Sequence, residues 1–348
     1  MGPGFWGEGS WPEFRRIDGD CSIGRAVAST ATGGQDAEVT ALHCRHGHNA
    51  SVKFTHMAQL IGLSALWGAS FMLIRIASPQ LGPTVLAFMR IGLATVVLGV
   101  LMRVMKHHWP LRYWWELAWL GLLSVAAPFM LFAWAGLHLP AGYSALLNST
   151  AVLFGIFGAW WMKEDTLTLR KLLGCLCGFC GVALIVSLGP VEPTPLVVLA
   201  ALACVGASGC YGLSTSLMKR ALSRMQPLEM AAGIHALAWF MLLPAASWSL
   251  PQAHFSPAAL AATTVLGVVT SGLAYWLHLR IMVHVTPVAA MSPTFLIPVF
   301  GVIWGHVFLG ERLSSGIYLG GALVLLASAL VTGLNPWQRW LDAADAKP

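Results

Sequence analysis

Charged residues are scarce in this chain of 348 residues. Asp, Glu, Lys and Arg together make up 10% of it, whereas hydrophobic residues make up 57%. A soluble globular domain carries roughly a quarter charged residues, so the deficit excludes an ordinary soluble protein. The alternating pattern of an outer-membrane barrel is also missing, because the apolar runs are long and rich in Leu, Ala, Gly and Val. The remaining fold class is an all-α integral membrane protein.

Other missing patterns narrow the function. The seven cysteines are scattered and do not suggest a disulfide framework. No Walker-type phosphate loop is present, which excludes ATP as the direct energy source. The basic residues, which give a formal net charge of +6, stand in short clusters between apolar runs, where they set topology rather than bind nucleic acid. No cofactor or metal ion is expected, because Cys175 does not share a helix face with Cys177 and Cys180.

The first 56 residues differ from the rest of the chain. They are rich in Gly, His and charged residues, show no helical periodicity, and contain no apolar core of the kind a secretory signal needs. We expect residues 1–56 to be a disordered or misassigned extension, with Met57 as the working start. Residues 335–348 are expected to form a cytoplasmic tail.

A succession of apolar runs follows, separated by prolines and short polar loops. A spanning helix needs about 20 apolar residues, and the stretch from Ala58 to Leu334 has room for about ten of them. We expect spans near 58–77, 84–104, 115–136, 141–162, 172–189, 195–217, 228–249, 258–278, 287–309 and 316–334.

Lys and Arg residues predict the orientation, because loops that carry them stay in the cytoplasm. Basic residues follow the second, fourth, sixth and eighth spans, whereas the loops after the third, fifth and seventh spans carry none. Only Arg75 and Arg312 fall on the predicted outer side of the membrane. Both termini are therefore predicted to be cytoplasmic, in the inner (cytoplasmic) membrane of the cell.

The sequence also repeats itself. A shift of 144 residues places Trp67-Gly68-Ala69-Ser70 on Tyr211-Gly212-Leu213-Ser214, and a shift of 147 places Glu164 on Glu311. Each unit holds five spans, and because five is odd, the second unit enters the membrane in the opposite orientation. We expect inverted repeats at 57–190 and 191–334, an organisation typical of carriers.

These motifs resemble the EamA-type members of the drug/metabolite transporter superfamily. The resemblance rests on Trp67-Gly68-Ala69-Ser70-Phe71, on Arg90, on Lys163-Glu164 with Gly174 and Gly178, and on Pro298-Val299 followed by Gly310-Glu311-Arg312-Leu313. It implies ten helices in two five-helix repeats, a central cavity between them, and small organic metabolites as cargo. Small multidrug-resistance relatives bind cationic drugs through an acidic residue in the first helix. Residues 58–77 contain none, which favours neutral, zwitterionic or anionic cargo.

Arg90 is a charge in the middle of a predicted span, where it costs about 2.5 to 3.5 kcal/mol on insertion scales. It could attract a carboxylate or phosphate of the substrate, or it could be held by carbonyl groups of a neighbouring helix. Its repeat equivalent is Ile234, with His235 beside it. Any site would therefore be asymmetric.

Aromatic and small polar residues recur at related positions of the two halves and should face protein or water rather than lipid. Helix packing explains the small residues equally well. The predicted substrate-binding residues are Trp67, Ser70, Arg90, Asn148, Tyr211, Ser214, Tyr275 and Thr294.

Glu164, Glu311 and Pro298 are assigned structural or gating roles. The two glutamates end the fourth and ninth spans on opposite faces of the membrane, and each is expected to fix a helix end. They cannot share a proton directly.

Together these features predict a secondary active transporter of small organic metabolites, amino-acid-like or otherwise neutral, zwitterionic or anionic, with export as the expected direction. Its partners would be the solute, the bilayer and, as one option, protons, and it would act as a monomer or homodimer. The alternatives are a nucleotide-sugar or phosphate-ester carrier of the same superfamily, a channel-like or signalling membrane protein, and an intramembrane protease using Ser208 of Gly206-Ala207-Ser208-Gly209. The repeat relation of that motif to Gly62-Leu63-Ser64-Ala65 favours helix packing over catalysis.

Overall fold

The computed structural model describes residues 54–162, 168–187, 192, 194–284 and 292–332. Within these ranges all regular structure is helical and no strand occurs. The extension predicted at 1–56 lies outside the described residues except for the start of the first helix at Phe54, and the tail predicted at 335–348 lies wholly outside them.

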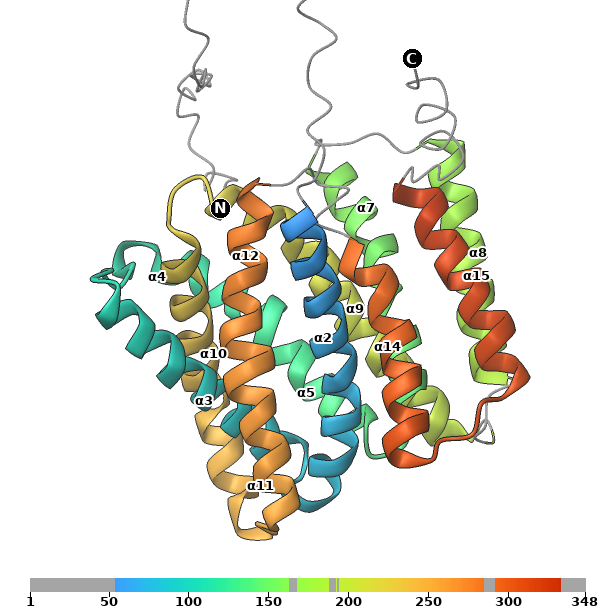
Figure 1. Ribbon diagram of the computed structural model, residues 1–348, viewed down its shortest axis with the longest axis horizontal. Helices are drawn as coiled ribbons and strands as arrows, with labels where there is room; N and C mark the ends of the chain where they lie inside the picture. Colours follow the sequence, from blue (N-terminus) through green and yellow to red (C-terminus); the bar gives the residue numbers. More distant parts are fainter. Residues whose placement is uncertain (1–53, 163–167, 188–191, 193, 285–291, 333–348) are drawn as a thin grey trace, which may run out of the picture. The chain divides into compact units, whose positions relative to one another are not determined.

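The first half of the chain forms a series of apolar helices, several of them broken by irregular turns (Figure 1). A φ angle of 74° at Gly82 allows the chain to reverse between the first two. These elements are α2 (Phe54–Leu81), α3 (Pro83–Val104), η1 (Leu111–Tyr113), α4 (Trp114–Gly121), η2 (Leu122–Ala126), α5 (Ala127–Ala135), α6 (Ala141–Asn148), α7 (Ala151–Trp161) and α8 (Leu169–Ser187).

The second half repeats this pattern. Several of its helices begin with proline, which lacks an N–H that the first turn would leave unpaired anyway. Thr194 and Ser256 cap two of these starts through their side-chain oxygens. The elements are α9 (Pro195–Ala221), α10 (Pro227–Ser249), η3 (Leu250–Gln252), α11 (Pro257–Thr264), η4 (Val265–Leu273), α12 (Ala274–His284), α14 (Ser292–Leu309) and α15 (Ser315–Thr332).

Among the described residues, 7 helical segments are long and apolar enough to cross a membrane. Two shorter apolar helices, Leu296–Leu309 and Ser315–Ala327, follow them near the C-terminal end. The described helices occupy the regions predicted as spans, and the count of ten remains a prediction.

The helices pack with a pseudo-twofold relation between the two halves. The first helix of each half packs against the fourth membrane segment of the other half: α2 against α14, and α9 against α7. Equivalent helices also pair with each other, α3 with α10 and α8 with α15, and Figure 1 shows α8 and α15 side by side at one edge. The repeat seen in the sequence is therefore also a repeat of helix contacts.

Two glycines that are 144 residues apart lie at close contacts between these helices. A Cβ atom on Gly68 of α2 would lie 2.9 Å from the backbone nitrogen of Gly301 and 3.0 Å from the carbonyl oxygen of Ile297, both in α14. A Cβ atom on Gly212 of α9 would meet the backbone of Gly155 and Ala151 in α7 in the same way. Small residues let the backbones of membrane helices approach, and here both copies of the repeat use one.

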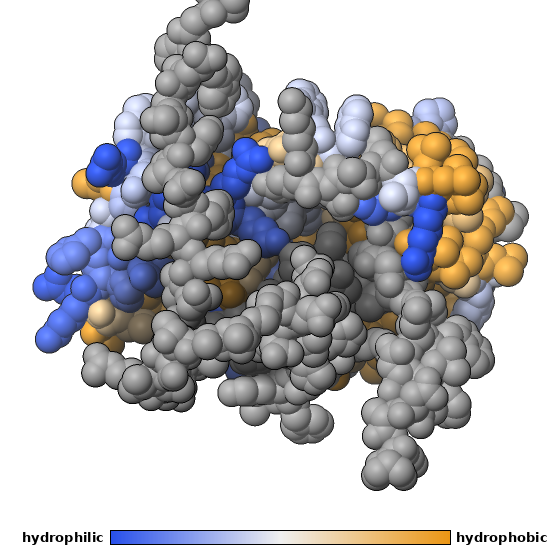
Figure 2. Space-filling model, turned by 90° about the horizontal axis from the view of Figure 1, so that it is seen from above, coloured by the Kyte–Doolittle hydropathy of each residue, from blue (hydrophilic) through white to orange (hydrophobic). Residues whose placement is uncertain are grey.

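Basic side chains gather toward the end of the bundle at which α3, α9 and α12 end. Arg224 binds Glu116 at 2.7 Å, and His107 lies 3.1 Å from Glu229, so the loop after α3 is tied to the start of α10. Figure 2 looks onto this end of the bundle and shows hydrophilic side chains on one side of it, with hydrophobic ones at the opposite edge.

The glycine contacts lead to a stability prediction. Gly68→Ala and Gly212→Ala should each lower the thermal unfolding midpoint in detergent, because the added methyl group meets backbone that cannot move aside, at a cost of about 1 to 3 kcal/mol. Gly62→Ala and Gly206→Ala are matched controls, also 144 residues apart: nothing lies within 4 Å of the first added Cβ, and the nearest atom to the second is 3.9 Å away. Equal midpoints in all four variants would contradict the close-packing role.

Candidate functional site

Arg90 lies in the middle of α3 with only 6% of its surface exposed. Its Nε donates a hydrogen bond to Ser271 Oγ at 2.6 Å, and a terminal guanidinium nitrogen donates to Thr270 Oγ1 at 3.5 Å. The guanidinium carbon lies 3.8 Å from the centre of the Phe129 ring. The charge is therefore stabilised by two neutral hydroxyl groups and an aromatic face.

No carboxylate among the described residues neutralises Arg90. Of the described acidic residues, Glu116 pairs with Arg224, Glu229 pairs with His107, and Glu311 binds backbone N–H groups. Glu192 lies exposed ahead of α9. A guanidinium has five N–H donors, so Arg90 keeps donors and an uncompensated positive charge for an anionic group.

Trp67 of α2 contacts the same residue, Thr270. Its indole nitrogen donates to the carbonyl oxygen of Thr270 at 3.1 Å, and its ring meets His278 of α12 edge-on, with centroids 5.0 Å apart. Thr270 thus contacts Trp67 through its backbone and Arg90 through its side chain. One residue of the second half joins two candidate residues of the first.

The contacts of Thr270 and Ser271 depend on an irregular turn. Both residues belong to η4, a π-helical segment, and the other π-helical segment, η2, occupies the related place in the first half. A π-turn inserts one residue and rotates the side chains that follow, and such turns are frequent at functional sites.

Aromatic side chains continue the cluster toward α9. Tyr211 stacks on Phe132 with centroids 6.1 Å apart, and Phe132 meets Phe71 edge-on at 5.2 Å. Trp67 and Tyr211 both pack against the hydrophobic core to which Phe71 and Phe132 belong, and Trp67 is joined to Arg90 through Thr270. Trp67, Arg90 and Tyr211 therefore belong to one cluster between the two halves.

Tyr275 belongs to a second, related cluster. Its hydroxyl lies 3.2 Å from Ser124 Oγ and 3.3 Å from Met218 Sδ, and its ring meets His235 edge-on at 4.8 Å. His235 therefore lies against Tyr275 much as Arg90 lies against Phe129. His235 follows Arg90 by 145 residues, and Tyr275 follows Phe129 by 146 residues. The structure thus gives His235, rather than Ile234, the place that corresponds to Arg90.

The comparison with known proteins agrees with this two-part organisation. The model of the EamA-like transporter family matches residues 56–187 and again residues 198–333. The chain belongs to the EamA-like transporter family. The predictions of an all-helical membrane fold with two repeats, of membership in this superfamily, and of a transporter rather than an enzyme are thereby confirmed.

Several bacterial relatives are similar over most of their length. The uncharacterised transporter YvbV of Bacillus subtilis is 25% identical over 80% of this chain and 91% of its own. A probable terminal-alkyne amino-acid exporter of Streptantibioticus cattleyicolor is 24% identical over 76% and 89%, and the protein PecM of Dickeya dadantii is 24% identical over 79% and 91%. A solved crystal structure with 17% identity shares the fold, with a TM-score of 0.60 over 81% of this chain and 98% of that one.

Membership in the EamA-like family removes the protease alternative, and the surroundings of Ser208 agree. Its hydroxyl lies 2.8 Å from the carbonyl oxygen of Cys204 and 3.3 Å from that of Leu147. Neither His235 nor His278 is among its hydrogen-bond partners. Ser208 is a packed helix residue that joins α9 to α6.

The remaining candidates lie apart from the Arg90 cluster or outside the described residues. The hydroxyls of Ser70 and Ser214 bond to carbonyls of their own helices, at 3.3 Å and 3.0 Å. Asn148 ends α6 beside the break at Ser149 and Thr150, and its side-chain oxygen has no partner within the described residues. Pro298 is buried inside α14. Glu164 and the side chain of Thr294 lie outside the described residues.

Glu311 connects the two halves near the opposite end of the bundle from the basic cluster. Its two carboxylate oxygens accept hydrogen bonds from the backbone nitrogens of Ala141 at 2.6 Å and Gly142 at 3.1 Å, the first residues of α6. Its own carbonyl oxygen lies 2.9 Å from His306 Nδ1. A carboxylate at a helix N-terminus is favoured by the unpaired N–H groups and the helix dipole. We call this contact the Glu311 cap.

Sequence reasoning did not identify Thr270, Ser271 or Phe129 as partners of Arg90. A usable signal was present, since Thr270-Ser271-Gly272 is a run of small and polar residues inside an apolar span. The Phe129 contact carried no comparable signal, because phenylalanine is common in lipid-facing and buried helix surfaces alike.

Arg90 yields the main prediction for this site. With the compound that binds best in a thermal-shift screen of amino acids and small carboxylates, Arg90→Gln should weaken binding about 10- to 150-fold, the loss expected for a charged hydrogen bond of about 1.5 to 3 kcal/mol. The affinity of Arg90→Lys should lie between those of Arg90→Gln and the native chain, because lysine keeps the charge but loses the planar donor geometry.

The control for Arg90 is another arginine of a membrane helix. Arg75 donates to the carbonyl oxygens of Gly136 at 2.8 Å and Leu137 at 3.0 Å, which closes the end of α5. Arg75→Gln should lower stability and leave affinity unchanged. Unchanged affinity and rate in Arg90→Gln would remove Arg90 from the site.

Proposed function

We propose that this EamA-like protein is a secondary carrier of small organic solutes bearing a carboxylate, with zwitterionic amino acids as the leading class. The observation that carries the proposal is the buried charge of Arg90, which no carboxylate in the described part of the chain compensates. Burying a charge without a counter-charge in a membrane protein is costly, and such residues commonly mark substrate pathways. A carboxylate arriving at Arg90 would supply the missing negative charge.

The surrounding side chains suggest how the rest of the solute is held. Phe129 presents its aromatic face to the guanidinium, Trp67 and Tyr211 add aromatic rings to the same cluster, and Ser271 and Thr270 supply hydroxyl groups. A solute with one anionic end and an apolar body fits this combination. The relative described as a probable amino-acid exporter supports the same class, and export is the proposed direction.

The nucleotide-sugar alternative receives no comparable support. A diphosphate group carries two or more negative charges and is commonly held by several basic residues. In the described part of the chain, the cluster between the halves contributes one arginine, and its repeat counterpart is the histidine His235.

The proposed mechanism is alternating access between repeats at 57–190 and 191–334, with both termini in the cytoplasm of a cell whose inner membrane the protein spans. Under this proposal the Glu311 cap closes the outer end of the site, because the basic clusters identify the other end as cytoplasmic. Coupling to protons and uncoupled exchange are both compatible with it.

Reconstituted vesicles test the carrier proposal. Uptake of radiolabelled phenylalanine, aspartate and lysine by vesicles with and without the protein should show saturable transport of at least one of the first two, and faster uptake when the same solute is preloaded inside. Lysine should be transported least, because its second amino group adds a positive charge near Arg90. Flux that rises linearly with concentration, with no effect of preloading, would indicate a channel instead.

The Glu311 cap can be tested through a native cysteine. Cys204 is fully buried in α9, and α9 packs against α6, the helix that the cap fixes. In a chain whose other cysteines are replaced by serine, Glu311→Ala should raise the rate of Cys204 labelling by a membrane-impermeant maleimide roughly tenfold, since a charged hydrogen bond of about 1.5 kcal/mol is lost.

His306→Ala is the matched control for the cap, because His306 contacts the backbone of Glu311 and leaves the carboxylate in place. Its labelling rate should match that of the native chain. Equal labelling in Glu311→Ala and His306→Ala would mean that the carboxylate does not hold the outer end closed.

A further inference from the structure

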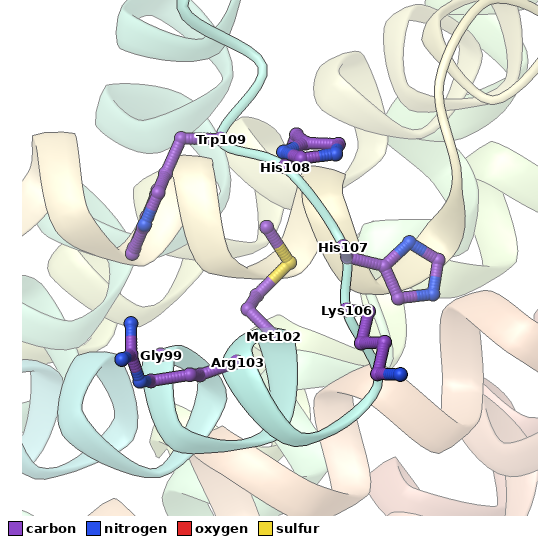
Figure 3. Close-up of a pocket in the computed structure, with 7 residues that line it drawn as sticks. All are labelled: Gly99, Met102, Arg103, Lys106, His107, His108 and Trp109. Carbon is purple, nitrogen blue, oxygen red and sulfur yellow. The ribbon is translucent and has the colours of Figure 1, made fainter.

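A hollow of about 410 Å³ opens where α3 ends (Figure 3). Neither Trp67 nor Tyr211 is among the residues that line it. It is lined by Gly99, Met102, Arg103, Lys106, His108 and Trp109, and by His107 at one side. Figure 3 shows the Trp109 ring and the Arg103 side chain facing each other at one side of the hollow, with Lys106 and His107 on the other side and Met102 in the middle.

The hollow is positively charged because no carboxylate in the described part of the chain pairs with Arg103 or Lys106. Arg103, Lys106 and His108 form no ion pair with any residue in the described ranges, whereas the two nearby glutamates are engaged: Glu229 with His107 and Glu116 with Arg224. An anionic group is therefore the ligand that this surface attracts.

The backbone holds Lys106 at the rim in an unusual conformation. Its φ angle is 57°, the left-handed region that a helix end normally assigns to glycine. The N–H of Lys106 bonds to the carbonyl of Arg103, and the N–H of His107 bonds to that of Met102, which completes a Schellman turn. A lysine in this conformation costs about 1 kcal/mol of folding stability relative to glycine. The chain therefore carries a positive charge at a position where glycine would be more stable.

The surface beside the hollow is apolar and exposed. Val100, Val104 and Leu111 expose 57%, 72% and 75% of their surface, and three tryptophans of the next helix, Trp114, Trp115 and Trp119, are also exposed. Exposed tryptophans next to basic residues at the end of a spanning helix are typical of the interface between membrane and water. The hollow therefore lies at headgroup depth, with hydrocarbon-compatible side chains beside it.

We propose that this hollow binds the phosphate headgroup of an anionic glycerophospholipid from the leaflet at that end of the bundle. Arg103, Lys106 and His108 would donate to the phosphate oxygens, and Trp109 would pack on the glycerol backbone. The acyl chains would follow the exposed valines of α3. A soluble phosphate ester would share the basic contacts but gain nothing from the apolar side chains, which favours the lipid.

Native mass spectrometry of the full chain in detergent tests this assignment. Titration with phosphatidylglycerol should show one lipid bound more tightly than the rest, and phosphatidylcholine should not replace it. The double variant Arg103→Gln and Lys106→Gln should weaken that binding roughly thirtyfold, since each basic residue near an anionic membrane surface contributes about 1 kcal/mol. Trp109→Ala should also weaken it.

Two controls keep the test decisive. The first control is the double variant Lys219→Gln and Arg280→Gln, which removes the same charge from the same end of the bundle and should retain the lipid. The second is the double variant Arg103→Lys and Lys106→Arg, which keeps the charge of the hollow and guards against loss of binding through misfolding. Glycerol 1-phosphate should not displace the lipid. Equal loss of affinity in both charge-removing pairs, equal binding of phosphatidylcholine, or displacement by glycerol 1-phosphate would each overturn the lipid site.

Discussion

The buried guanidinium of Arg90 is the constraint on which the centre of this transporter depends. A charge inside the bilayer needs partners, and none of the partners of Arg90 among the described residues is charged: two hydroxyls and one aromatic ring stabilise it. The hydroxyls come from η4 in the second half of the chain, whereas Arg90 and Phe129 come from the first. The arginine therefore joins the two repeats at the interface that would have to move under the proposed alternating access.

The repeat relation shows that one scaffold supports two different centres. Arg90 over Phe129 and His235 against Tyr275 occupy corresponding places, yet only the arginine is permanently charged. Under the proposed function, a solute bound between the halves would meet a cation on one side and an aromatic, hydroxyl-bearing surface on the other. This asymmetry would orient a molecule that has one anionic end, which a symmetric pair of sites could not do.

The sequence supported the helices, the repeat and Arg90, because each leaves a strong local signal: apolar length, recurrence at a fixed shift, and an isolated charge. It did not identify the partners of Arg90, because the π-turn in η4 changes the side-chain register by one residue, which helical periodicity cannot show. The partners of Glu311 were hidden for a different reason. They are the backbone N–H groups of Ala141 and Gly142, and every residue except proline has one.

The Glu311 cap links the repeat to a transport cycle. The shift of 147 residues that places Glu164 on Glu311 also places Ala141 and Gly142 on Val288 and Ala289. Glu164, Val288 and Ala289 lie outside the described residues. The described cap joins the end of α14 to the start of α6, and α6 also packs against α2 and α9. Under the proposed alternating access, exposing the site on the outer side would require this cap to break. The free energies of the capped and uncapped states would then have to be similar for the proposed carrier to cycle.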